Sequence, residues 1–352
     1  MQPRFAAETL AALRETRRDG RLRYWALLAL PLPLAVVALA FGRYEISPAA
    51  VVQTLGHALA GQPAATAAEA LVLQVRLPRI LAALLIGAAL SGSGTAFQGI
   101  FKNPLVDSNI LGVTSGAGFG AALALLLTGS LTLASVAAFV CGLAAMLLAH
   151  FGARAHGGSH TLMLTLSGIL VGSFFAALTS LVKILADPLS ELPAITFWLL
   201  GGLSDVTWRD LPLLLLITGV GSAFLYAVRW QLNVLSLGDR EAAALGLNTR
   251  QMKLLVVGVA SLLTAAAVAV GGVIGWVGLV IPHAGRLLVG PDHRRLLPVS
   301  LSLGAAFLLV IDTLARAALP REVPLGVFTG IVGVPVLFLL LRRSRGGAGW
   351  TE

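Results

Sequence analysis

The sequence predicts an all-α integral membrane protein with about ten transmembrane helices, and three observations lead to that fold class. Of the 352 residues, 57% are hydrophobic and only 12% are charged, which is about half the charged fraction of a soluble domain. The mean hydropathy is +0.89. Apolar stretches long enough to cross a bilayer recur from Tyr24 to Leu341.

The apolar runs can be placed one after another along the chain. We expect spans at 24–41, 80–100, 110–128, 131–151, 162–184, 211–228, 254–274, 277–289, 298–318 and 324–341. They form one membrane domain over 24–343, between a polar N-terminal segment, 1–23, and a tail, 344–352. The first run begins late and lacks a small-residue cleavage site before Gly42, so we interpret it as a retained span rather than a signal peptide.

The eighth run, 277–289, differs from the others because it is too short to cross unaided at about 1.5 Å per residue. It follows the glycine-rich stretch VGGVIGWVG. We therefore expect it to belong to a bent or broken helix, which is tolerated where protein rather than lipid surrounds the backbone.

The distribution of basic residues predicts the orientation. The net charge is +9, but the cations lie between apolar spans, as in a membrane topology signal, which excludes a nucleic-acid-binding class. An even number of spans puts both termini on one side, and most of the 25 Lys and Arg residues fall on that side. The rule that basic loops stay inside then makes both termini cytoplasmic, in a bacterial inner membrane.

Four segments carry a family resemblance. They are RLPRILAALLIGAALSGSGTAFQGIFKNPLVDSNILGVTSGAGFGAAL at 76–123, SLGDREAAALGLN at 236–248, GGVIGWVGLVIPHAGRLLVGPDHRRLLP at 271–298 and PLGVFTGIVGVPVLFLLLRR at 324–343. In this order they resemble the permease subunits of ABC importers for iron siderophores, haem and cobalamin (FecCD and BtuC-like, the type II importers). The resemblance covers most of the chain, about 70–343.

The resemblance implies a division of labour among several chains. A type II permease works as a pair, as a homodimer or with a paralogue, with two cytosolic ATPase subunits and a periplasmic or lipid-anchored substrate-binding protein. The sequence agrees, because it contains no G-x-x-x-x-G-K-[ST] phosphate loop. We therefore expect a non-catalytic transport subunit that binds no cofactor, while ATP and Mg²⁺ are used by the partner ATPase.

The segment at about 236–248 is the candidate for ATPase coupling. Charged residues followed by small ones and then a glycine predict a short helix whose C-terminal cap is Gly246. From residue types alone it is equally well a solvated loop; by resemblance it is the coupling helix that docks into the ATPase. The coupling residues would be Leu237, Gly238, Asp239, Arg240, Glu241, Ala242, Ala243, Leu245 and Gly246.

Three arginines are candidates for docking the binding protein. By resemblance, Arg76, Arg79 and Arg316 lie on the outer face and meet acidic residues of that protein, since a guanidinium pairs bidentately with a carboxylate; the alternative is snorkelling to lipid headgroups. Asp312 precedes Arg316 by four residues, which predicts a structural ion pair on one helical face. We expect Asp312 to hold Arg316 towards the outer vestibule.

The linker at 152–161 resembles the inner gate of the family. Its candidate gate residues are Ser159, His160 and Thr161, although an ordinary turn has the same composition. A metal site is not expected there, because no Cys or carboxylate accompanies the histidines and Gly157–Gly158 disfavours a helix between His156 and His160.

The expected cargo is a ferric siderophore or similar metal chelate, with haem, cobalamin or molybdate as alternatives. The pathway would lie between two copies, lined by 165–184 and 324–338, and the outer segment 187–208 resembles iron-chelate members more than cobalamin ones.

Two other classes of membrane protein fit the sequence poorly. A membrane-embedded hydrolase needs a buried nucleophile with a base, and an ion-coupled carrier needs protonatable groups at the midplane and inverted repeats.

Overall fold

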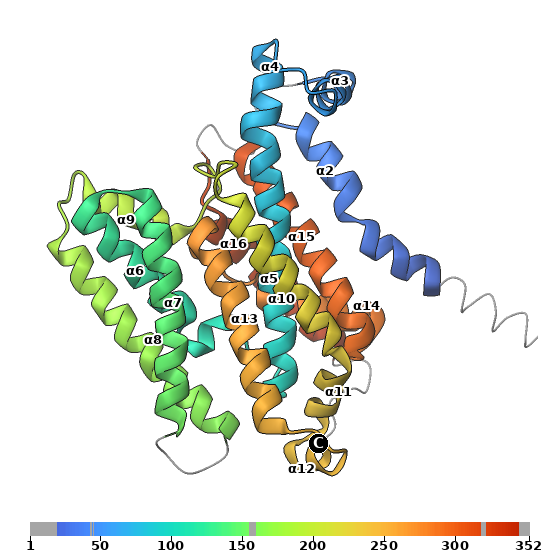
Figure 1. The fold of residues 1–352 in the computed structure, drawn as a ribbon, viewed down its shortest axis with the longest axis vertical. Coiled ribbons are helices and arrows are strands. Elements are labelled where there is room, and N and C mark those ends of the chain that lie inside the picture. Colours follow the sequence, from blue (N-terminus) through green and yellow to red (C-terminus); the bar gives the residue numbers. More distant parts are fainter. Residues whose placement is uncertain (1–19, 43, 45, 155–159, 318–321, 345–352) are drawn as a thin grey trace, which may run out of the picture.

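The computed structural model describes residues 20–42, 44, 46–154, 160–317 and 322–344, and within them every regular element is a helix (Figure 1). The predicted all-α membrane fold is confirmed. Each predicted span corresponds to a helix. They are Gly20–Ala40 with α2 (Pro31–Ala40) as its second half, α5 (Leu77–Phe101), α6 (Val113–Thr128), α7 (Leu131–Arg154), α8 (His160–Leu185), α10 (Leu211–Ala227), α13 (Thr249–Gly271), α14 (Val277–Val289), α15 (His293–Ala317) and α16 (Leu325–Ser344).

These helices differ in their capacity to cross a membrane alone. Within the described residues, six are long and apolar enough, and a seventh span results if α10 and α11 (Arg229–Leu237), bent by 57° at their junction, count as one. The helices α6, α14 and α16 are apolar but shorter. As expected for the eighth segment, α14 follows an irregular break at Gly272–Trp276.

Besides α4 (Ala67–Ala70) and α11, two longer helices were not predicted. They are α3 (Pro48–Leu59) and α9 (Glu191–Leu200), in segments read as polar or as an outer loop. The start of α3 has a local signal in the sequence: Ser47 accepts a hydrogen bond from the Ala50 backbone N–H at 3.2 Å, and Pro48 occupies the first helical position. Sequence reasoning overlooked it because the helix is too short to span.

The central helix is longer than its predicted range, 80–100. A single helical run extends from Ala67 to Phe101, made of α4 (Ala67–Ala70), a π-helical stretch (Leu71–Arg76) and α5. Most of it is buried within the bundle (Figure 1). The π stretch places Pro78 in the first turn of α5, where a missing N–H costs little.

Close backbone contact joins α5 and α15. A Cβ on Gly87 would lie 2.2 Å from the carbonyl oxygen of Gly304, so neither helix tolerates a side chain at this crossing. Near it, the Ser91 hydroxyl donates to the Ser300 carbonyl oxygen at 2.8 Å. Small residues let helices meet where lipid supplies no hydrophobic drive for association. The two helices therefore form a tightly packed pair.

The bundle has two ends, which we name by the helices there. The α3 end carries α3, α4 and the end of α15, and the α12 end carries α12 (Asp239–Ala244), the end of α5 and the start of α15 (Figure 1). Helices α5 and α15 both extend from one end to the other, and they run in opposite directions.

Candidate functional site

The segment predicted for ATPase coupling forms a separate short helix at the α12 end. Helix α11 stops at Leu237, and Gly238 turns the chain into α12 with a φ of 143°. A Cβ at this position would lie 2.0 Å from a carboxylate oxygen of Glu241. Gly238 is therefore required for its backbone angle, whereas the exposed end of the Glu241 side chain can move aside.

The predicted glycine cap of α12 is present. The N–H of Gly246 donates to the Ala243 carbonyl at 2.9 Å, and the N–H of Leu247 donates to the Ala242 carbonyl at 3.0 Å. With Gly246 at a φ of 82°, this is the Schellman arrangement that ends helices. The six-residue helix is thus closed at its C-terminal end by its own sequence.

The surface of α12 is open to a partner. Ala242 is fully buried and anchors the helix on the bundle, whereas Leu237 and Leu245 are 61% and 60% exposed. The other exposed members of the predicted segment are Asp239, Arg240, Glu241, Ala243 and Gly246. Two large apolar side chains at the polar end of a membrane protein, beside small residues and charges, form a surface suited to protein docking.

An ion pair that sequence reasoning missed joins α12 to α13. The ammonium of Lys253 lies 2.6 Å from one carboxylate oxygen of Asp239 and 2.8 Å from the other. The lysine is almost fully buried, while the aspartate is half exposed. The spacing of fourteen positions across a helix boundary gives no periodic signal, so only the fold reveals the pair.

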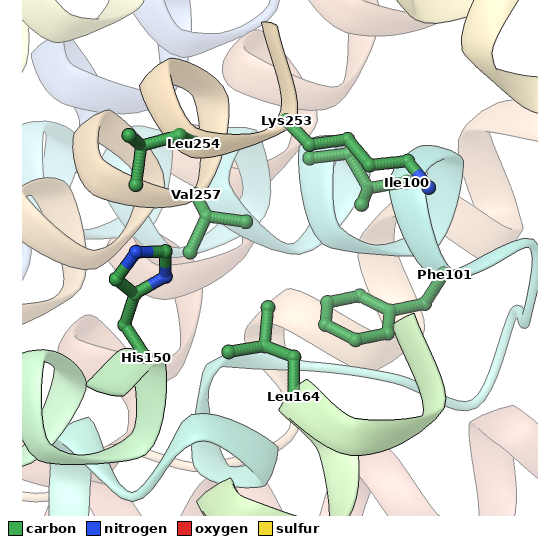
Figure 2. A pocket seen from close by; sticks show the side chains of 7 residues that line it. All are labelled: Ile100, Phe101, His150, Leu164, Lys253, Leu254 and Val257. Atoms are coloured by element: carbon green, nitrogen blue, oxygen red, sulfur yellow. The ribbon is translucent and has the colours of Figure 1, made fainter. Parts of the chain in front are cut away.

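A small cavity lies beside Lys253. Figure 2 shows His150 of α7 and Leu164 of α8 facing Phe101 of α5 and the side chains of α13 across it. Its volume is about 10 Å³, about one water-sized sphere. The junction between α7–α8 and α5–α13 is therefore close-packed directly beneath the coupling segment.

The candidate inner gate is only partly visible. Ser159 lies outside the described residues. His160 and Thr161 begin α8, but their side chains also fall outside what the structure describes. Across the described residues, no group of three His, Cys, Asp or Glu side chains is arranged to hold a metal ion.

The three candidate docking arginines gather at the α3 end, but they point into the bundle. Arg76 and Arg79 are 4% and 7% exposed, and the Arg316 side chain is nearly as buried. Docking of the binding protein by these arginines stays a prediction, although the structure holds their side chains inside the bundle. The physical reason is the continuous helix from Ala67, which carries the RLPR segment between α2 and α15 rather than into a loop.

Each arginine has a specific set of partners. The Arg76 Nη1 donates to the Leu39 carbonyl at 2.6 Å, and the Arg316 Nη2 donates to the Ala38 carbonyl at 2.7 Å. Both partner carbonyls belong to the last turn of α2. A helix C-terminus has carbonyls without intrahelical partners and a partial negative charge, so guanidinium groups stabilise it.

The predicted pair of Asp312 and Arg316 is present but secondary. Asp312 Oδ2 lies 3.7 Å from Arg316 Nε. Arg79 is closer: its Nη2 lies 2.7 Å and its Nε 2.9 Å from Asp312 Oδ1. Arg79 also contacts the carboxylate of Glu322. Asp312 thus contacts Arg79 more closely than it contacts Arg316.

A larger cavity of about 950 Å³ opens at the same end. It is bounded by the start of α7, by α9, by the end of α13 and by the start of α16. Its lining mixes aromatic, hydroxyl and charged side chains, including Phe197, Trp198, Ser204, Asp205 and Arg209. This volume is within the range of sites for drug-sized ligands.

Comparison with known proteins gives a consistent result. The profile of the FecCD transport family matches residues 28–343. The chain is 38% identical to the molybdate import system permease protein MolB of Haemophilus influenzae, over 89% of this chain and 93% of that protein. It is equally similar to a Helicobacter pylori protein described as a probable iron chelatin transport system permease protein, over 89% and 96%.

A solved structure extends the similarity to three dimensions. It is described as an inward-facing conformation of a metal-chelate type ABC transporter, and it superposes with a TM-score of 0.82 at 36% identity. The match covers 91% of this chain and 98% of that one.

Proposed function

The chain belongs to the FecCD transport family, and from this membership we propose that it moves a ferric siderophore or a similar metal chelate into the cytoplasm. Members are permease subunits of ABC importers, a non-catalytic component that implies ATPase and binding-protein partners. The observation that most supports this proposal is the exposed, capped helix α12, which offers a docking surface in a chain without a phosphate loop.

In this proposal the α12 end is cytoplasmic and both termini lie on that side, with 24–343 as a single membrane domain. The concentration of Lys and Arg on this side supports the orientation. The ATPase would contact Leu237–Gly246, with Leu245 seated in its cleft and the charges of Arg240 and Glu241 fixing the orientation. Ser159, His160 and Thr161 would form the inner gate.

The α3 end would receive the binding protein. Because Arg76, Arg79 and Arg316 are buried, their part in docking is to fix the ends of α2, α5 and α15 as a rigid platform.

The pathway would run between two identical copies, along α8 and α16. The exposed hydroxyls of Ser173 and Ser180 on α8 donate to carbonyls four residues earlier, at 2.9 and 3.0 Å. Their polarity is therefore satisfied within the helix, and the surface offers few groups that would bind a chelate tightly. A weakly binding wall suits the passage of a cargo already selected by the binding protein.

Molybdate is the second candidate cargo, favoured by the similarity to MolB across nearly the whole chain. The cavity of about 950 Å³ favours the bulkier chelate, since a four-oxygen anion would fill only a small part of it.

The test is reconstitution of the chain with its ATPase in lipid discs, followed by ATP hydrolysis with loaded binding proteins. Stimulation by a protein loaded with a ferric hydroxamate chelate supports the proposal. Stimulation only by a molybdate-loaded protein would replace the cargo. In sealed liposomes, uptake by the chain alone without nucleotide would overturn the mechanism.

A further inference from the structure

At the α12 end, one amide side chain joins α11 to the beginning of α15. The Asn233 Oδ1 lies 2.8 Å from the backbone nitrogen of His293 and 2.8 Å from Nδ1 of its ring. On its other side, the Asn233 Nδ2 donates to the Asp292 carboxylate at 2.6 Å. The fold brings Asn233 to the adjacent residues Asp292 and His293, which are about 60 positions further along the sequence.

The chemistry of this junction is that of a helix cap supplied by another helix. The first N–H groups of a helix have no intrahelical acceptor. Asp292, which directly precedes α15, satisfies one of these N–H groups, since its Oδ1 accepts from the Arg294 N–H at 2.9 Å. Asn233 satisfies the N–H of His293. Asn233 can do this while also donating to Asp292 because an amide carries both an acceptor and donors.

The junction reaches a third helix through His293. This ring is 5% exposed, and its Nε2 would lie 2.8 Å from a Cβ placed on Gly99 of α5. Helix α11 also packs directly on α5 and α15 (Figure 1). A displacement of Asn233 must therefore move His293, and there is no free space beside α5 to absorb the movement.

The same junction is connected to the coupling surface. Helix α11 leads through Gly238 into α12. Helix α12 is also attached to the bundle by the buried Ala242 and by the ion pair between the half-exposed Asp239 and the buried Lys253 of α13. Helix α15 runs from His293 past Asp312, so at about 1.5 Å per residue it spans about 28 Å between the junction and the network of Asp312 and Arg79.

We propose that Asn233 is a positioning residue that transmits movement of α12 to α15 and α5, an inference that rests on the proposed docking of the ATPase at α12. The acceptor and donor of its amide hold α11 against the capped start of α15. When the ATPase displaces α12, the start of α15 follows. Without this amide, the ATPase would still bind and hydrolyse ATP, but less of the displacement would reach the α3 end.

The experiment uses the complete importer in proteoliposomes and measures cargo transported per ATP hydrolysed. For Asn233→Leu, we expect ATPase binding within about twofold of wild type and a transport ratio at least about fivefold lower, the factor by which losing one hydrogen bond shifts an equilibrium. Ser236→Ala is the matched control, because within the described residues that exposed hydroxyl donates to the backbone carbonyl of Asn233 in its own helix and not to the Asn233 amide side chain. Its ratio should equal that of wild type.

An exchange of the two groups separates transmission from folding. Asn233→Asp places two carboxylates together and should uncouple the complex, whereas Asn233→Asp with Asp292→Asn restores one amide and one carboxylate and should recover the ratio. A normal ratio in Asn233→Asp, or an uncoupled double variant with normal thermal stability, would overturn the inference. Failure of the proposed function is distinct, since wild type itself would then show no stimulated hydrolysis or transport.

Discussion

The guanidinium of Arg79 in α5 forms two hydrogen bonds to one carboxylate oxygen of Asp312 in α15, at 2.7 and 2.9 Å, and that carboxylate is completely buried. The two residues are 233 positions apart. The pair therefore fixes the α3 ends of the two helices whose backbones touch at Gly87 and Gly304.

Asp312 is expected to be the most sensitive member of this network. Asp312→Ala removes the fully buried one of the two carboxylates that Arg79 contacts, which should destabilise the protein by about 3 kcal/mol, since breaking a buried pair costs about 3–5 kcal/mol and Glu322 remains. Arg316→Gln should cost less, because its contact with Asp312 is 3.7 Å long. Thermal unfolding in lipid discs measures the loss of stability in each of the two variants. Equal losses for Asp312→Ala and Arg316→Gln would contradict this ranking.

The helix crossing at Gly87 is expected to reject any side chain. Gly87→Ala places a Cβ 2.2 Å from the Gly304 oxygen, so α5 and α15 must separate and the folded yield should fall sharply. Gly258→Ala is the matched control, since no atom lies within 4 Å of its added Cβ. That control should be neutral or stabilising by up to about 1 kcal/mol, because alanine favours helix. Yield after size-exclusion chromatography compares the two.

Leu245 is expected to contribute to ATPase binding. Leu245→Asp should weaken the affinity for the ATPase subunit about tenfold or more, since burying a leucine contributes about 1.5–3 kcal/mol. Leu59→Asp is the control, because Leu59 is also exposed but lies in α3 at the opposite end. Binding in detergent or lipid discs gives both values. Equal weakening by the two variants would exclude α12 as the docking element.

Orientation can be checked by thiol labelling. In a Cys141→Ser background, Leu245→Cys should react with an impermeant maleimide only from the cytoplasmic side, and Val52→Cys only from the outside. Both parent side chains are at least 60% exposed, so access is not limited by burial. The reverse pattern would invert the proposed topology.

The start of α15 is expected to be sensitive to acid. Although partial burial opposes ionisation, hydrogen bonds from Arg294 N–H and the Asn233 amide lower the pKa of the Asp292 carboxyl below its usual 3.8. A lowered pKa means that Asp292 contributes stability above about pH 4, and that this contribution is lost as the pH falls through the folded-state pKa. Thermal midpoints between pH 6 and pH 3 should fall more for wild type than for Asp292→Asn; parallel curves would contradict this.

Local patterns predicted much of the fold. The spans follow from apolar runs, and the end of α12 follows from Gly246, because both depend on neighbouring residues in the sequence. The predicted pair of Asp312 and Arg316 has the same origin, a spacing of four on one helix. The stronger partner, Arg79, could not be found in this way, since its contact with Asp312 depends on how two distant helices pack.

The same limit explains the other omissions. Asn233 and Lys253 are ordinary residues in sequence, and only the fold places them against the ends of α15 and α12. The helix α3 is different, since its Ser-Pro start was readable and was passed over because membrane-spanning length was the criterion.

The hydrogen bonds that hold the first span have a consequence for biogenesis. Arg316 and Ser302, which donate to carbonyls of Ala38 and Leu27, are translated near the end of the chain. The Ser302 donor follows its acceptor by 275 residues, a delay of about 14 to 55 s at common rates of synthesis. Arg76 can hold the last turn of the first span much earlier, since it follows Leu39 by 37 residues, whereas the contact at Leu27 has to await α15. The segment that enters the bilayer earliest is therefore fully secured only when the chain is almost complete.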